Sequence, residues 1–330
     1  MKIQRILKFD IEELAYINLK IIERNVKETT MIIIKMNGGL GNQLQQYALY
    51  EKFKSLGKEV KVDTSWFYGN QGKTSKRDLE LEYFPKVSFQ TCTAEEMQKI
   101  LGNRGLLKKV AEKLKLTQKP IYVEHQMYDE QIFQMDEKVL EGYWACEAYY
   151  ADIIPLLQEK LEFPPSDNPK NKAMAEEMQQ CNSVSIHIRR GDYMTEENQA
   201  MFGGICTEEY YEEAIAYIKE NVPDARFFIF SDDPEYVREK YAGEECTIID
   251  INHGKDSFYD IYLMSQCKHN ICANSTFSFW GARLNQNPGK KVIRPLKQKN
   301  CDWYVPEKMK QLWKGWILID EEGKMIEGKR

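Results

Sequence analysis

Several motifs that would assign this chain to a common class of enzyme or metalloprotein are missing from its sequence. None of its eight cysteines forms a Cys-x-x-Cys pair, and its four histidines show no metal-ligand spacing. No Asp-x-Asp is present, so the carboxylate pair that commonly holds a metal ion on a diphosphate is absent. Gly-x-Ser-x-Gly and the full phosphate-loop pattern Gly-x4-Gly-Lys-Ser/Thr are also absent. We therefore expect neither a metal site nor a serine-hydrolase or P-loop mechanism.

Long apolar segments are missing too. No run approaches the roughly 20 residues that span a bilayer, and residues 1–30 lack the uninterrupted apolar core of a signal peptide. Their helical spacing predicts a docked or partner-binding helix, with a membrane-surface helix as the alternative. We expect a cytoplasmic protein with free thiols, peripheral attachment to the inner face of the membrane being the alternative. The net charge of −5 gives no reason to expect nucleic acid as a partner.

What the sequence does contain is an alternation of apolar strands and helices, in a chain of 330 residues that is long enough for two domains. Residues 31–36 predict a buried strand, followed by a glycine-rich turn, a helix and a strand near residue 60. Further strands are predicted at residues 183–188, 227–230, 247–250 and 269–273, with helices between them. This order predicts an α/β fold with doubly wound parallel sheets.

A proline-rich segment, residues 164–169, is the best candidate for a linker, because it has too little apolar surface to form core. It divides the chain into an expected helical extension (1–30), an N-terminal α/β domain (31–165), a C-terminal Rossmann-like domain (166–300) and a tail that packs back across the domains (301–330). The aromatic-rich middle of the chain gives no clear pattern.

Residues 183–193 hold the most informative motif, an apolar strand that ends in HIRRGDY. Alternation along a strand places His187 and Arg189 on one face, at the carboxyl end where α/β sheets bind ligands. Arg190 begins the turn, so two guanidinium groups would converge on one anion, and Gly191 would let the backbone approach it. The alternative is a solvated arginine pair in which Asp192 forms an internal salt bridge.

Two further segments place small or polar residues before a helix. In residues 37–43 (NGGLGNQ), three glycines free the backbone N–H groups for an anion or a sugar. A dinucleotide fingerprint fits poorly, because Leu44 stands at the third glycine position, and a plain turn stays open. In residues 274–276 (NST), the side chains either cap a helix or donate to a phosphate as well. Phe277 is expected in the core rather than stacked on a ligand.

Taken together, these segments resemble the α-1,2-fucosyltransferases of glycosyltransferase family 11. The resemblance rests on four motifs in the family's order: residues 38–43 (GGLGNQ), 187–193 (HIRRGDY), 231–234 (SDDP) and 274–281 (NSTFSFWG). It implies a GT-B architecture, in which two Rossmann-like domains face a central cleft. It also implies GDP-fucose as the donor and a β-linked galactose as the acceptor.

The resemblance implies roles for individual residues. Arg189 would bind the diphosphate, His187 would contact the nucleoside, and Asp260 would bind guanine, although Asp260 could instead cap a helix. Asn42 would approach the donor and the acceptor from the first domain. The remaining donor-binding residues expected are Gly39, Asp232, Asn274, Ser275, Thr276 and Phe277.

The expected reaction is an inverting transfer without a metal cofactor, in which Arg189 and Arg190 stabilise the leaving diphosphate. Asp192 is the candidate general base, with a turn-stabilising carboxylate as the equal alternative. Two alternative functions stay open. One is a GDP-sugar transferase with a different acceptor, and the other is a non-catalytic protein that binds a GDP-sugar or a glycan. The sequence predicts neither the acceptor glycan nor the oligomeric state.

Overall fold

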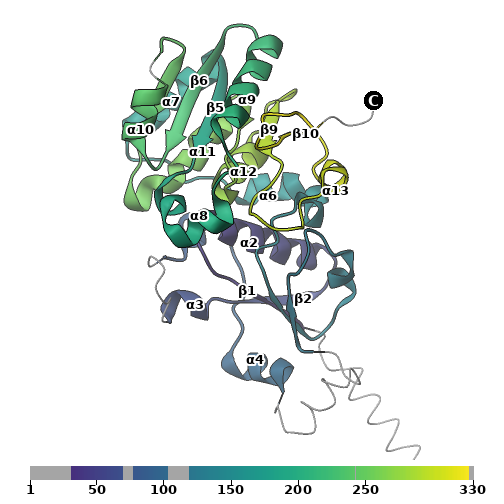
Figure 1. The fold of residues 1–330 in the computed structure, drawn as a ribbon. Helices are drawn as coiled ribbons and strands as arrows, with labels where there is room; N and C mark the ends of the chain where they lie inside the picture. Colours follow the sequence, from purple (N-terminus) through teal and green to yellow (C-terminus); the bar gives the residue numbers. More distant parts are fainter. Residues whose placement is uncertain (1–30, 70–76, 103–118, 242, 327–330) are drawn as a thin grey trace, which may run out of the picture.

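The computed structural model describes residues 31–69, 77–102, 119–241 and 243–326. In these residues the chain forms two parallel sheets, each flanked by helices (Figure 1). The predicted α/β class, with two units that are each built on a parallel sheet, is confirmed. The helix expected in residues 1–30 lies outside the described residues.

The first sheet has the strand order β2-β1-β4-β3, and all its pairs are parallel. Its strands are β1 (Met31–Lys35), β2 (Glu59–Asp63), β3 (Ile121–Val123) and β4 (Lys138–Glu141). The sequence did not predict β3 or β4, although β4 is the inner neighbour of β1. Strands of three or four residues are too short to show a period-2 alternation.

The second sheet is also parallel, with the order β10-β9-β8-β5-β6-β7. Its strands are β5 (Asn182–Ile188), β6 (Ala225–Ser231), β7 (Cys246–Ile249), β8 (His269–Ile271), β9 (Val292–Pro295) and β10 (Trp316–Ile319). The sequence missed β9 and β10. β10 comes from the segment expected as a tail, yet it pairs with β9 and forms one edge of the sheet.

Helices connect these strands, and the two faces of the second sheet are covered by different ones. The described α-helices are α2 (Leu40–Ser55), α3 (Ser65–Tyr68), α4 (Ala94–Leu101), α6 (Ile154–Lys160), α7 (Pro169–Gln180), α8 (Glu196–Phe202), α9 (Glu208–Asn221), α10 (Pro234–Lys240), α11 (Tyr259–Gln266), α12 (Thr276–Leu284) and α13 (Pro306–Leu312). The 3₁₀ helices are η1 (Glu80–Tyr83), η2 (Glu130–Gln134), η3 (Glu147–Tyr149), η4 (Ala151–Ile153), η5 (Gly191–Met194) and η6 (Gly254–Phe258). Among the described helices, none combines the length and apolar character that a membrane span needs.

Alternation along β5 decides what each face of the second sheet contacts. Val184, Ile186 and Ile188 share a core with the apolar residues of α9 and α10. The opposite face packs on α7 and α11 through a separate core. His187 therefore lies on the α7–α11 face, as the alternation predicted.

Helix α2 lies between the two units (Figure 1). Unlike a surface helix it has no polar face, and even Gln43, Gln45 and Gln46 are buried. Its N-terminus packs on α12: a Cβ atom added to Gly41 would lie 2.7 Å from the backbone nitrogen of Phe277. One continuous core joins residues of both units, which fixes their separation at this point.

Candidate active site

The order of strands in the second sheet reverses between β5 and β8, because β6 and β7 lie on one side of β5 while β8, β9 and β10 lie on the other. Open parallel sheets bind ligands outside the carboxyl ends of their strands at such a switch point. The turn after β5 holds Arg189 and Arg190, and the segment after β8 leads into α12. Because α2 packs on α12, the glycine-rich segment lies at the same place.

His187 is a buried, neutral side chain on β5. It is 5% exposed and its ring centroid lies 5.8 Å from that of Phe277. Burial, and secondarily the charge of Arg189, lowers the pKa of His187 to about 3. Within the described residues, its Nδ1 atom has no hydrogen-bond partner. A buried ring nitrogen without a partner is costly, so it is available to a ligand on this face.

Arg189 is held by two carboxylates. Its Nη2 donates to Asp192 Oδ1 at 2.6 Å, and its Nη1 lies 2.9 Å from Asp232 Oδ2. The other oxygen of Asp232 accepts from the backbone N–H of Arg190 at 2.8 Å. A Cβ atom at Gly191 would lie 2.9 Å from Asp232 Cγ, so this position needs glycine to admit that carboxylate. The ion pair between Arg189 and Asp192 is the geometry that the turn-stabilising alternative described.

Arg190 takes a different direction from Arg189. Its Nε donates to Asp233 Oδ2 at 3.0 Å, and its guanidinium carbon lies 3.7 Å from the ring centroid of Tyr236. The two guanidinium groups are thus paired with different carboxylates and do not converge as the sequence predicted. Asp233 also caps α10 by accepting from the backbone N–H of Tyr236 at 3.1 Å.

The hydroxylated residues at the start of α12 have separate tasks. Ser275 caps the helix, its Oγ accepting from the backbone N–H of Phe277 at 3.4 Å. Thr276 Oγ1 donates to Asn42 Oδ1 at 3.1 Å and so joins the two units. The side-chain amide of Asn274 donates to backbone carbonyls of Phe202 and Gln298, so this amide group is already occupied. What α12 offers an anion is its N-terminal dipole and backbone.

The glycine-rich segment is shaped by its own contacts. Gly38 has φ +82°, and a Cβ atom there would lie 2.7 Å from Asn42 Nδ2. Gly39 occupies the N-cap of α2 and provides no side-chain cap. The side chain of Asn42 lies against Gly38, where only glycine leaves room for it. From there it contacts Thr276 at the start of α12.

Asp260 lies in the first turn of α11, and it does not cap the helix. Its Oδ1 accepts from Asn252 Nδ2 at 2.8 Å, and Asn252 in turn exchanges two hydrogen bonds with Asn171 of α7. Burial raises the pKa of Asp260 to about 7; the bond from Asn252 opposes this and the charge of Asp250 adds to it. The carboxyl group therefore titrates near neutral pH.

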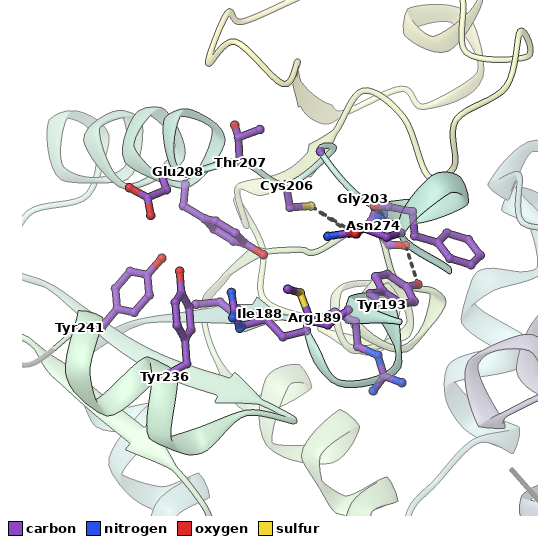
Figure 2. A pocket seen from close by; sticks show the side chains of 16 residues that line it. Ile188, Arg189, Tyr193, Gly203, Cys206, Thr207, Glu208, Tyr236, Tyr241 and Asn274 are labelled. Carbon is purple, nitrogen blue, oxygen red and sulfur yellow. Dashed lines mark hydrogen bonds between the residues drawn. The ribbon is translucent and has the colours of Figure 1, made fainter. Parts of the chain in front are cut away.

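A cavity of about 160 Å³ opens beside Arg190, on the α9–α10 face of β5 (Figure 2). Tyr236 and Tyr241 lie at one end and Tyr193 and Asn274 at the other (Figure 2). The sequence analysis did not single out Tyr236. Its position three residues after Asp233, which caps α10, was the signal that could have placed Tyr236 near Arg190.

Metal ligands are not gathered anywhere in the part of the chain that the structure describes: no three His, Cys, Asp or Glu side chains are placed to hold an ion. The expectation that the protein needs no metal cofactor stays a prediction.

Solved structures with some likeness to this chain include two fucosyltransferases. NodZ from Bradyrhizobium matches with 13% identity and a TM-score of 0.42, over 78% of this chain and 93% of that one. A mutant of Arabidopsis thaliana FUT1 in complex with GDP matches with 12% identity and a TM-score of 0.45, over 84% of this chain and 73% of that one. At these scores the likenesses add nothing to the topology described above.

Two sequence relatives match over most of the chain, and a third matches over a smaller part of it. An Escherichia coli α-1,2-colitosyltransferase is 30% identical over 301 residues, 88% of this chain and 100% of that protein. The Escherichia coli O-antigen biosynthesis glycosyltransferase WbnK is 29% identical over 86% of this chain and 99% of that protein. Galactoside α-(1,2)-fucosyltransferase 1 of Saimiri boliviensis boliviensis is 29% identical over 31% of this chain and 28% of its own length.

The family model described as Glycosyl transferase family 11 matches residues 136–320, more than half of the chain. This range holds the turn after β5, the segment after β8 and Asp260. The motifs that suggested the family are thus found together at one switch point, and the chain is a glycosyltransferase that belongs to glycosyl transferase family 11.

Proposed function

We propose that this protein transfers L-fucose from GDP-β-L-fucose, with inversion, to the 2-hydroxyl of a β-linked galactose in a glycan acceptor. The observation that carries the proposal is the arrangement at the switch point between β5 and β8. Arg189, the neutral His187 and the N-terminus of α12 lie there together, and α2 of the first unit closes against them. The α-1,2 linkage is suggested by the names of the relatives.

In this proposal the nucleotide lies on the α11–α12 face of β5. Asp260 accepts from the N1–H and the exocyclic amine of guanine, and His187 hydrogen-bonds to the nucleoside. Arg189 exchanges one of its carboxylate partners for the β-phosphate, since the guanidinium fork fits phosphate oxygens as well as carboxylate oxygens. The diphosphate also meets the positive end of α12.

The acceptor hydroxyl attacks the anomeric carbon from the side opposite GDP, which turns a β-linked donor into an α-linked product. Negative charge grows on the leaving phosphate, where Arg189 lies ready before the reaction. A preorganised donor of this kind contributes about 3–4 kcal/mol to lowering the barrier. No protein group needs to form a covalent bond with the sugar in a single displacement.

A second donor sugar has an observation in its favour. The relative that is 30% identical over 88% of this chain is a colitosyltransferase. Colitose is the 3-deoxy counterpart of fucose. The two donors share the nucleotide, so the residues that hold GDP do not distinguish them.

The test is a transfer assay with GDP-fucose and GDP-colitose against a panel of β-galactosides, followed by linkage analysis of the product. We expect an α-1,2-linked fucoside from at least one galactoside. Transfer from GDP-colitose at a kcat/KM more than tenfold higher than from GDP-fucose would assign the donor to colitose instead. Donor cleavage that never yields a glycoside would contradict the proposal.

A further inference from the structure

The first sheet has a switch point of its own, between β1 and β4. β2 lies on the outer side of β1, and β4 and β3 lie on the other side, so the loops after β1 and β4 are neighbours at the carboxyl edge of this parallel sheet. Gln46 joins these loops: its Oε1 accepts from the backbone N–H of Asn37 and its Nε2 donates to the carbonyl of Gly142, both at 3.0 Å. These two hydrogen bonds hold the loops after β1 and β4 together at this edge of the sheet.

The loop after β4 fixes one carboxylate through its backbone N–H groups. Glu124 follows β3 directly. Its Oε2 accepts from the backbone N–H of Tyr143 at 2.8 Å, and the backbone N–H of Trp144 is shared by Oε1 and Oε2, each at 3.2 Å. Gly142 leaves room for it, since a Cβ atom there would lie 2.5 Å from Glu124 Cβ. Trp144 has φ +56°, a left-handed conformation that is strained for a bulky residue. The loop after β4 thus adopts a costly shape that aims two amides at one side chain.

Glu124 also faces the second unit. The positive charge of Lys299, on the loop that follows β9, acts on its carboxyl group. The next residue, Asn300, donates from its backbone to the carbonyl of Met201 in α8 at 2.7 Å. Helix α8 follows the turn that holds Arg189, so Glu124 lies across from the donor side of the molecule.

The immediate surroundings of Glu124 suit a sugar. Tyr143 beside it is 47% exposed, so an aromatic surface and a fixed carboxylate lie next to each other at the mouth of the switch point. Sugar and cofactor sites combine such apolar aromatic surface with a few precisely placed polar groups. Asp192, the other carboxylate considered, is occupied by Arg189 at 2.6 Å.

We propose that Glu124 is the catalytic base of the transfer and that Tyr143 forms the floor of the acceptor site in the first unit. This rests on the proposed function. The acceptor oxygen forms its bond to the anomeric carbon while the bond from that carbon to the β-phosphate oxygen breaks and its electron pair leaves with GDP. The hydroxyl proton passes to Oε1 of Glu124, which shares only the Trp144 N–H with Oε2, and from there to solvent.

The titration of Glu124 supports such a task. Burial raises the pKa of its carboxyl group, and the amides of Tyr143 and Trp144 and the charge of Lys299 oppose that rise. A base works best when its pKa lies near the working pH. The titratable groups whose charges interact with it, besides Lys299, are Tyr122, Tyr143, Tyr149, Tyr150 and Tyr304. Burial raises the pKa of each of these tyrosines, so they stay neutral between pH 5 and pH 9 in an assay.

Glu124→Gln is the decisive variant, because its side-chain oxygen can keep both backbone hydrogen bonds while the amide cannot take a proton. We expect kcat of transfer to fall by roughly 10²–10⁴-fold, with the Kd for GDP and the melting temperature unchanged. The rise of kcat with pH on the acidic side should disappear in the variant. Glu130→Gln, which changes an exposed carboxylate of the same unit, is the matched control and should behave as wild type.

Three outcomes overturn the assignment: transfer by Glu124→Gln within about threefold of wild type, an unchanged pH profile, or a loss of GDP binding that matches the loss of activity. A separate measurement does not depend on turnover. Lactose should bind to the GDP-saturated wild-type protein, and Tyr143→Ala should weaken it at least fivefold. A wild-type protein that binds lactose but transfers neither fucose nor colitose would refute the proposed function and leave the acceptor site standing. Absence of lactose binding in a protein that does transfer to galactosides would refute the acceptor site alone.

Discussion

Arg189 is the residue on which most of the proposed chemistry depends. Its fork is already oriented by Asp192 and Asp232, at 2.6 Å and 2.9 Å. We expect Arg189→Ala to lower kcat by 10²–10³-fold, the scale for removing one charge-stabilising donor. Arg189→Lys should not restore the rate, because an ammonium group cannot bind phosphate in the bidentate way. Steady-state kinetics measure this.

The control for Arg189 is Arg226→Lys. Arg226 is half-exposed, stands near the start of β6, and its Nη2 lies 3.2 Å from Glu177 Oε1. It should keep activity within about twofold. Retention of most activity by Arg189→Lys as well would mean that Arg189 is a solvated surface charge.

Asp260 makes nucleotide binding depend on pH in a predictable direction. Its pKa of about 7 lies above the ordinary value, so the carboxyl group takes up a proton as the pH falls through 7. Guanine presents two donors, which only the ionised carboxylate accepts without conflict. The Kd for GDP should therefore rise as pH falls from 8 to 5.5, by up to tenfold per unit below pH 7, as isothermal titration calorimetry would show.

Asp260→Asn separates this effect from titration of the phosphate itself, whose own pKa lies near 6. The variant should bind GDP more weakly at pH 8 and lose most of the steepness of the pH dependence. It should also narrow the preference for GDP over UDP and ADP by roughly 1–3 kcal/mol, the range for a lost buried partner. Equal inhibition of the wild type by GDP and UDP would show that the donor is assigned wrongly.

At the scale of elements, the contact of α2 with α12 sets how the two units meet. Alanine for glycine inside a helix normally stabilises by up to about 1 kcal/mol. At Gly41 the added carbon would lie 2.7 Å from backbone atoms of Thr276 and Phe277, which cannot rotate away. We expect Gly41→Ala to reverse the sign and to destabilise by about 1–3 kcal/mol, and to weaken GDP binding because the start of α12 moves.

Thermal melting and GDP titration test this, with Gly243→Ala as the matched control, since nothing lies within 4 Å of a Cβ atom there. The control should melt within a degree or two of wild type. A Gly41→Ala protein that melts at or above the wild-type temperature would show that the two helices separate easily.

At the scale of the whole molecule, the proposed function requires protein groups alone to stabilise the negative charge on the leaving GDP, without a metal ion. The described residues place no metal-ligand cluster, and the chain has no Asp-x-Asp pair. Dialysis against EDTA should leave the transfer rate within about twofold. A complete loss that Mg²⁺ or Mn²⁺ restores would contradict the account based on arginine and a helix terminus.

The sequence by itself determined the features that are encoded over short distances. The apolar run of β1 predicted a buried strand, and alternation along β5 predicted the face that His187 occupies. The polar residues 274–276 predicted the start of a helix, and Ser275 caps α12 by accepting from the backbone N–H of Phe277 at 3.4 Å. These features follow from side chains within a few positions of each other, so a linear pattern is enough to show them.

The tertiary structure decided the rest, because it depends on which segments meet. β3, β4, β9 and β10 are too short to be stable or recognisable alone, and they exist because neighbouring strands supply their hydrogen bonds. The turn of Arg190 toward Tyr236, the network from Asp260 to Asn171, and Glu124 under the loop after β4 all join residues far apart in the chain. No local sequence pattern predicts such contacts. The direction of a side chain at the end of a strand depends on neighbouring charges and packing that exist only in the folded protein.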